Sequence, residues 1–200
     1  MANQSSAKVT IVAYKVGPEV QHYIDANAGF DYDILSSEGD GYKVQKDGDT
    51  WTFAGCATGR WSYAANVRGY FGAEGAWLNS DNGPKYRELM DALERTHGSV
   101  TLDWSDCDPA MDWIHTARAS VEVDEDGHAS FSGVEVIELW DYNLLNLLEA
   151  FDYTLTEAIL MHAGEDNAEF LWNLWNSVNQ TAPASSEAVD DNADRCDPFL

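Results

Sequence analysis

The densest group of carboxylates in the sequence lies between residues 103 and 112. Hard cations such as Ca²⁺ and Mg²⁺ bind through several oxygen ligands, so a loop with four carboxylates predicts a divalent-cation site or the metal centre of a hydrolase. The spacing is not that of an EF-hand, and a solvated loop whose turn starts at Asp108-Pro109 explains the same residues without a ligand. Both interpretations stay open, and no other cofactor is expected. The four residues are Asp103, Asp106, Asp108 and Asp112.

The sequence also contains five His and three Cys, residue types that serve in metal centres and in nucleophilic catalysis. Their spacing matches no zinc-ligand pattern, and no nucleophile elbow, phosphate-binding loop or dinucleotide-binding fingerprint is present. A nucleophilic pair between Cys56 or Cys107 and a distant His stays open, because the sequence does not show which side chains meet in the fold. No particular reaction is indicated, and a protein without catalytic activity is favoured.

A second set of carboxylates lies in a segment that has no Lys or Arg at all. Between Arg118 and Arg195, 76 positions hold 17 Asp or Glu and neither Lys nor Arg. Ordinary protein surfaces mix both signs of charge, so this segment cannot neutralise itself. It must present a negative field to solvent, to a cation or to a basic partner.

Nine carboxylates of this segment are expected at the surface of one strand and two amphipathic helices. Side chains three or four positions apart on a helix lie about 5–6 Å apart at Cβ, and the phosphates of a DNA strand recur at about 3.4 Å of axis per nucleotide with added lateral displacement. A fixed face of carboxylates can therefore imitate a phosphate backbone. Solvation of the outer helix faces is the simpler explanation, but it leaves the missing Lys unexplained. The candidate partner-binding residues are Glu135, Glu138, Asp141, Glu149, Asp152, Glu157, Glu165, Asp166 and Glu169.

This charge pattern predicts an acidic protein-binding inhibitor that blocks a DNA- or RNA-binding enzyme, as phage- or plasmid-encoded antirestriction and anti-CRISPR proteins do. Its expected partner is a basic nucleic-acid-binding protein or a nuclease complex. One alternative is a metal-binding protein or hydrolase that uses the segment from Asp103 to His115. Another is an acidic accessory or scaffold protein without a catalytic role. The net charge of −24 opposes direct binding of nucleic acid or of an anionic membrane.

The net charge is distributed unevenly, with −3 in residues 1–80, −8 in residues 81–130 and −13 in residues 131–200. A salt-adapted protein is usually acidic throughout, so this asymmetry favours a functional charge. Three widely spaced Cys without a CxxC motif favour a reducing compartment. The first residues do not resemble a signal peptide, and no apolar run is long enough to span a bilayer. We therefore expect a cytoplasmic protein, located in the host cytoplasm if a phage encodes it.

The hydrophobic pattern predicts the elements that position these residues. Alternating, β-branched segments predict strands over residues 8–14, 42–46, 50–58, 100–104, 113–123 and 129–139, with a further strand over 30–35. Asp47-Gly48 and Asp126-Gly127 supply the turns of two hairpins. The alternation breaks near Gly133, which predicts a β-bulge. Helical spacing predicts a short helix after Pro18, a helix within residues 59–71, one from Pro84 to Gly98, and two more after residue 141.

Together these elements predict an α+β domain over residues 1–180. Antiparallel hairpins would form a sheet, and a central helix and a C-terminal helical hairpin would pack on it. Residues 181–200 are rich in Ala, Ser, Pro and acidic residues, and they predict a disordered acidic tail.

Overall fold

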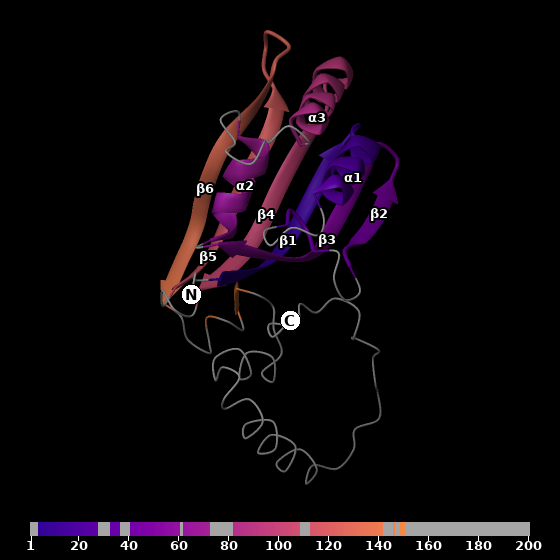
Figure 1. Ribbon diagram of the computed structural model, residues 1–200. Helices are drawn as coiled ribbons and strands as arrows, with labels where there is room; N and C mark the ends of the chain where they lie inside the picture. The colour runs from indigo at the N-terminus through magenta and orange to yellow at the C-terminus, as the bar shows by residue number, and fades with distance from the viewer. Residues whose placement is uncertain are drawn as a thin grey trace.

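In the computed structural model, the described residues form one six-stranded antiparallel sheet with three helices on one of its faces (Figure 1). These residues are 4–27, 33–36, 41–60, 62–72, 82–108, 113–141, 146 and 149–150. The strands are β1 (Gln4–Tyr14), β2 (Lys43–Asp47), β3 (Thr50–Arg60), β4 (Ser99–Asp108), β5 (Trp113–Val123) and β6 (Ala129–Asp141). The helices are α1 (Gly17–Ala26), α2 (Tyr63–Phe71) and α3 (Asn82–Thr96).

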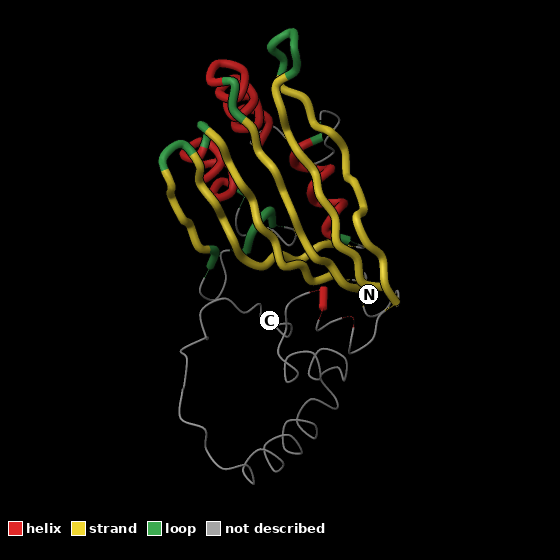
Figure 2. The backbone as a smooth tube through the Cα atoms, turned by 180° about the vertical axis from the view of Figure 1, so that it is seen from behind, coloured by secondary structure: helices red, strands yellow, loops and turns green. Residues whose placement is uncertain are grey.

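The strand order across the sheet is β2-β3-β1-β4-β5-β6. The chain leaves β1 through α1 to the β2–β3 hairpin, and β3 returns to pair with β1. It then crosses through α2 and α3 to β4, which pairs with the other side of β1. These are the two split β-α-β units of a ferredoxin-like sheet, with a pair of helices in the second crossover and with β5 and β6 added. The two edges of the sheet are therefore β2 and β6 (Figure 2).

Alternation along the strands divides the sheet into a helix-covered face and the opposite face, which we call the open face and on which Cys107 and Ile114 are nevertheless buried. On the central strand, Val9 and Ile11 are buried in the core, whereas Thr10 and Val12 belong to the open face. The strand pairings extend this division across the sheet. The core continues in Phe53, Leu102, Ala117 and Val121. The open face carries many small hydroxyl residues, among them Ser6, Thr10, Thr52, Thr58, Thr101, Ser105, Thr116 and Ser120.

Local contacts explain how the helices attach to the sheet. Pro18 lies in the first turn of α1, where its missing N–H costs no hydrogen bond. At the start of α2, the backbone N–H of Tyr63 donates to the carboxylate of Asp106 on β4. A carboxylate at a helix N-terminus satisfies an unpaired donor and interacts favourably with the helix dipole. Helix α3 buries Leu89 and Leu93, one turn apart, against the sheet.

The α+β class, the antiparallel sheet and both hairpins are confirmed. Gly48 and Gly127 have positive φ values of 58° and 87°, as the Asp-Gly turns predict. The strand predicted over 30–35 is wrong for Ile34 and Leu35, which lie in a bend. Both side chains are buried, so their apolar character reflects packing in the core instead of strand pairing. Strand β4 continues to Asp108 and does not end at residue 104.

The predicted helical hairpin falls largely outside the described residues, and the tail over 181–200 lies entirely outside them. The domain boundary at residue 180 therefore stays a prediction. Within the described part of the chain, no helix has the length and apolar character needed to cross a membrane.

Candidate partner-binding surface

The segment from residue 119 to residue 194 has neither Lys nor Arg, and most of its described residues lie in the β5–β6 hairpin. Its turn is held by Asp124, whose Oδ1 accepts hydrogen bonds from the backbone N–H groups of Asp126 (3.0 Å) and His128 (2.8 Å). Gly127 supplies the positive φ that closes the turn. The carboxylate of Asp124 thus stabilises the turn, while Glu125 and Asp126 extend the exposed acidic surface.

Two irregularities in the β5–β6 pairing determine which side chains of β6 share a face. Gly133, with a φ of 86°, lies at the first, as the broken alternation predicts, and Ile137 is the extra residue at the second. Residues three positions apart normally point to opposite faces of a strand. Because of the second bulge, Glu135 and Glu138 pair with residues two positions apart on β5 and lie on the same open face. Their positions along the strand are therefore about 7 Å apart.

Arg118 on β5 is the last basic residue before this surface. Its Nε lies 2.7 Å from Oδ1 of Asp103 on β4, and its Nη2 lies 3.1 Å from Oδ2, so the ion pair is bidentate. This hydrogen bonding, and the charge of Asp103, raise the pKa of Arg118. Glu135 pairs with Arg118 from the other side. The guanidinium is thus engaged by Asp103, and Glu138 forms no ion pair with any residue in the described ranges.

The opposite face of β6 is apolar and solvent-exposed. Val136 and Leu139 pair with residues on the helix-covered face of β5, but 54% and 68% of their surfaces are exposed. Ile137, the bulged residue, is 53% exposed. Exposed apolar residues that are rimmed by charged groups mark interaction surfaces. We call the exposed carboxylates of the hairpin the acidic edge, which consists of Glu122, Glu125, Asp126, Glu135, Glu138 and Asp141.

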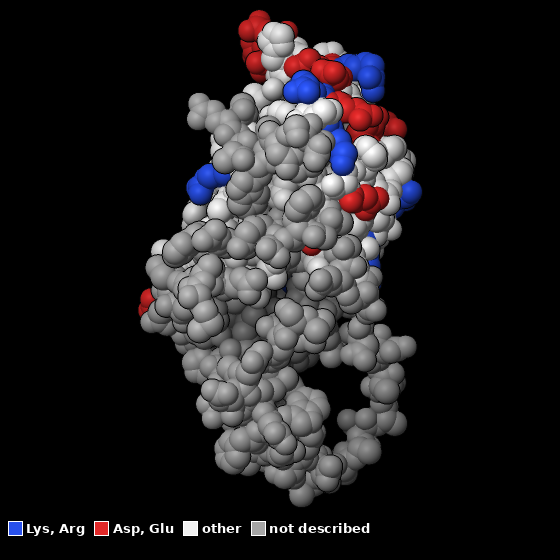
Figure 3. Space-filling view, viewed as in Figure 1, with Lys and Arg blue, Asp and Glu red and all other residues white. Residues whose placement is uncertain are grey.

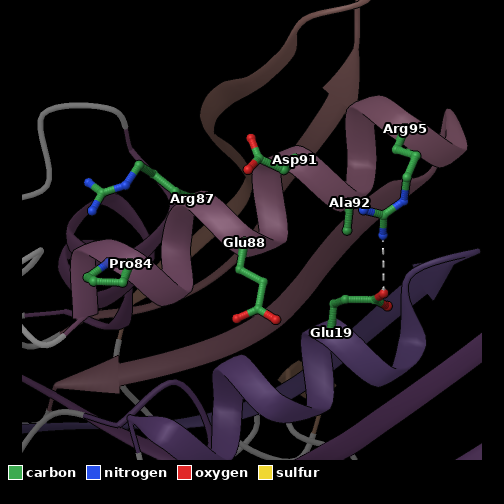
Figure 4. Close-up of a pocket in the computed structure, with 7 residues that line it drawn as sticks. All are labelled: Glu19, Pro84, Arg87, Glu88, Asp91, Ala92 and Arg95. Carbon is green, nitrogen blue, oxygen red and sulfur yellow. Dashed lines mark ion pairs between the residues drawn. The ribbon is translucent and has the colours of Figure 1, made fainter.

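The acids of α3 differ from the acidic edge because basic residues lie among them. Glu88 and Asp91 line a groove of about 390 Å³ between α1 and α3, together with Arg87 and Arg95 (Figure 4). Nη2 of Arg95 lies 3.8 Å from Oε1 of Glu19 on α1. In the space-filling view, acidic and basic side chains lie side by side at this end of the molecule (Figure 3). A surface of mixed charge is typical of a solvated helix.

Glu94, which also lies on α3, has a structural role. Its Oε1 accepts a hydrogen bond from the backbone N–H of Ala129 (3.1 Å) and lies 3.7 Å from Nδ1 of His128. This contact fixes the start of β6 against α3. The carboxylate of Glu94 therefore helps to hold the hairpin in place.

The predicted cation site does not form one cluster, because β4 places Asp103 and Asp106 on opposite faces of the sheet. Asp103 lies on the open face and pairs with Arg118, whereas Asp106 is fully buried on the other face and caps α2. The sequence predicts a loop here, but β4 continues through these residues, and its alternation separates the two carboxylates. Among the residues the structure describes, no three His, Cys, Asp or Glu form a group that could hold a metal. Asp112 lies outside the described ranges.

The pairing of β4 with β5 brings together two buried polar side chains, Asp106 and His115, which the sequence does not predict. Nε2 of His115 on β5 lies 3.9 Å from Oδ2 of Asp106. Burial, and to a lesser extent the positive charge of Arg68, lower the pKa of His115 to about 4, so the imidazole is neutral at pH 7. The hydroxyl of Tyr63, next to this pair, donates to the carbonyl of Ile34. This cluster attaches α2 to the sheet.

The two cysteines in the described ranges do not form a nucleophilic pair with His115. The buried thiol of Cys107 lies opposite Ile114 on the open face, whereas His115 lies on the helix-covered face. Cys56 is disulfide-bonded, which removes its thiol as a nucleophile. This bond differs from the reduced cysteines that the sequence predicts, and the cytoplasmic location stays a prediction.

Four of the nine predicted partner-binding residues are described. Glu135, Glu138 and Asp141 are exposed on β6. Glu149 is also exposed, and the carbonyl of its neighbour Ala150 accepts a hydrogen bond from Ser105 on the open face of β4. The other five, Asp152, Glu157, Glu165, Asp166 and Glu169, lie outside the described residues.

No protein-family model, no curated protein and no solved structure matches this chain. Its role therefore has to be inferred from the geometry and the charge of the surface around β6.

Proposed function

We propose that this protein is an acidic inhibitor that binds a basic nucleic-acid-binding protein through the acidic edge and occupies the site of its nucleic acid. The observation that carries the proposal is the exposed group of carboxylates on the β5–β6 hairpin, of which Glu122, Glu135 and Glu138 share the open face. These carboxylates belong to a segment that has no Lys or Arg from residue 119 to residue 194. A surface that lacks its own cations favours association with a partner that supplies them.

The rigidity of the hairpin supports phosphate mimicry over general solvation. The bulge at Ile137 places Glu135 and Glu138 on one face of a paired strand, at a separation of about 7 Å along it. Phosphates of a nucleic-acid strand recur at comparable intervals. Carboxylates on a paired strand keep their spacing when the partner approaches, so less ordering entropy is lost on binding than for a flexible acidic chain.

The partner of such a surface has an electropositive channel or groove. Restriction nucleases, RNA-guided nucleases and other basic nucleic-acid enzymes belong to this class. A phage or plasmid origin would fit such an activity and stays a prediction. Binding should be steeply weakened by salt, because surface charges are screened over about 10 Å at 0.1 M ionic strength.

The proposal is tested by capture from a lysate of the host at low and high salt. Immobilised wild-type protein should retain basic nucleic-acid-binding proteins at low salt, and duplex DNA or RNA should compete them off. The double variant Glu135→Lys, Glu138→Lys should lose this capture. The matched control is Asp47→Lys, Asp49→Lys, which changes the net charge equally but at the exposed end of β2 and in the turn that follows it. Equal capture by the β6 variant and the wild type would contradict the proposal.

A further inference from the structure

Cys56 on β3 takes part in a disulfide bond at the open face of the sheet. Its position pairs with Lys8 of the central strand β1, and both residues alternate with buried core residues of their strands. The exposure of Cys56 is intermediate, so solvent reaches this position. The bond therefore joins the open face of β3 to another segment of the chain.

The sequence contains three cysteines, so the partner of Cys56 within this chain is either Cys107 or Cys196. Cys107 on β4 pairs with Ser6 of β1, from the side of β1 opposite to β3. Adjacent strands lie about 4.8 Å apart, so two strand spacings already separate the Cα atoms of Cys56 and Cys107 by about 10 Å. A disulfide requires Cα atoms closer than about 7 Å. The geometry excludes Cys107 and leaves Cys196.

The chain after β6 returns to the open face. The carbonyl of Ala150 accepts a hydrogen bond from the hydroxyl of Ser105 on this face of β4. Cys107 and Ile114 are fully buried there, although the three described helices lie on the other face (Figure 2). The 46 residues from 151 to 196 can each span about 3.3 Å, which is more than enough to cross from β4 to β3.

The charges around the two cysteines favour the same pairing. Residues 187–197 carry five acidic side chains and one Arg, so the segment around Cys196 is acidic. Lys8 lies directly opposite Cys56, where Cβ atoms of paired residues are about 5 Å apart, and its ammonium group attracts an acidic segment. Cys56 of a second copy is a poorer partner, because two chains with a net charge of −24 each repel one another.

We propose that Cys56 and Cys196 form a disulfide that holds the acidic C-terminal end of the chain at the open face of β3, and that this bond is a redox-sensitive site. Intermediate exposure of Cys56 gives a small thiol reagent access to the bond. This inference goes beyond the proposed function and does not depend on it, because the acidic edge contains neither cysteine.

The reaction at this site is thiol–disulfide exchange. A thiolate of a dithiol reductant attacks one sulfur, and the other cysteine leaves as a thiolate that takes up a proton. The second thiol of the reductant then displaces the first cysteine from the mixed disulfide. Two protein thiols and the disulfide of the reductant result, so two electrons and two protons pass to the protein. A low-molecular-weight disulfide such as oxidised glutathione reverses the reaction and is itself reduced to two thiols.

The direct test maps the disulfide by mass spectrometry. The full-length protein is equilibrated with oxidised glutathione, and its remaining thiols are alkylated without reduction. Trypsin cleaves after Lys and Arg, so it separates the three cysteines into peptides 47–60, 96–118 and 196–200. We expect peptide 47–60 to be linked to peptide 196–200. A link from 47–60 to 96–118 or to a second 47–60 would overturn the proposal, and so would recovery of Cys56 as an alkylated thiol or a glutathione adduct.

Variants and redox titration test the partner and the sensitivity separately. Cys196→Ser should abolish the linked peptides and make the thiol of Cys56 available to alkylation, whereas the matched control Cys107→Ala should retain the link. With dithiothreitol and no denaturant, the linked peptides of the wild type should decrease at least tenfold. A link that survives in Cys196→Ser would overturn the assignment of the partner. A link that dithiothreitol removes only after denaturation would overturn the redox-sensitive site.

Discussion

The two edges of the sheet are built in opposite ways. β2 is five residues long and carries Lys43 and Lys46, both exposed. Such a short, lysine-bearing strand resists pairing with another chain. β6 is 13 residues long, carries no basic residue and exposes Val136, Ile137 and Leu139. One sheet therefore has an edge that is protected against association and an edge that is suited to a basic, partly apolar partner.

The core also differs between the two ends of the sheet. Among the described residues, the one buried imidazole is that of His115, which lies on β5 next to β6. The pKa of His115 is lowered to about 4, whereas an unfolded chain has the ordinary value of 6.5. Between these values the unfolded state binds a proton that the folded state does not, so the free energy of unfolding falls as the pH falls from 6.5 towards 4. The slope from this residue is at most about 1.4 kcal/mol per pH unit. Denaturant unfolding across this range should show a steeper loss for the wild type than for His115→Gln, and equal slopes would contradict the prediction.

Glycines near the two edges provide a matched pair of substitutions. Gly133 at the bulge and Gly48 in the β2–β3 turn both have positive φ, and a Cβ at either position would meet no atom within 4 Å. Gly133→Ala and Gly48→Ala should therefore each lower the free energy of unfolding by about 1–2 kcal/mol, through backbone strain alone. Only Gly133→Ala should also weaken capture of the basic partner, because this bulge sets the register of Glu135. A loss of capture in Gly48→Ala would show that the effect is not specific to β6.

The smallest predicted effect concerns the protected edge. Nζ of Lys46 lies 3.6 Å from the ring centroid of Trp51, so the ammonium group stacks on the indole. Lys46→Met should lower the free energy of unfolding by about 0.5–1 kcal/mol, and Lys46→Arg should preserve stability. Neither variant should alter capture of the basic partner. A change in capture would show that β2 also contacts the partner.

The sequence and the structure agree where the signals are local. Asp47-Gly48 and Asp126-Gly127 predict both hairpins, and the broken alternation after Phe131 predicts the bulge at Gly133, because turns and alternation depend only on neighbouring residues. The second bulge at Ile137 gives no comparable signal, since it lies within a run where apolar and acidic residues already mix. Sequence order alone does not predict that β1 lies between β3 and β4.

The candidate site was predictable only in part for the same reason. Exposed acids on β6 follow from the charge pattern and from the strand prediction. The separation of Asp103 and Asp106 requires knowledge that β4 extends to Asp108. The proximity of His115 to Asp106 depends on the register between β4 and β5, which is a tertiary property. The exposure of Leu139 follows from the position of β6 at the edge of the sheet, which the sequence does not specify.

The central claim is that β6, and not β2, is the binding edge. Amide hydrogen exchange of the full-length protein, with and without the captured basic partner, compares the two edges in one experiment, because amides that a partner covers exchange more slowly. We expect slower exchange in residues 134–141 when the partner is present and unchanged exchange in residues 43–47. Slower exchange at β2, or no change at β6 with the partner bound, would contradict the claim.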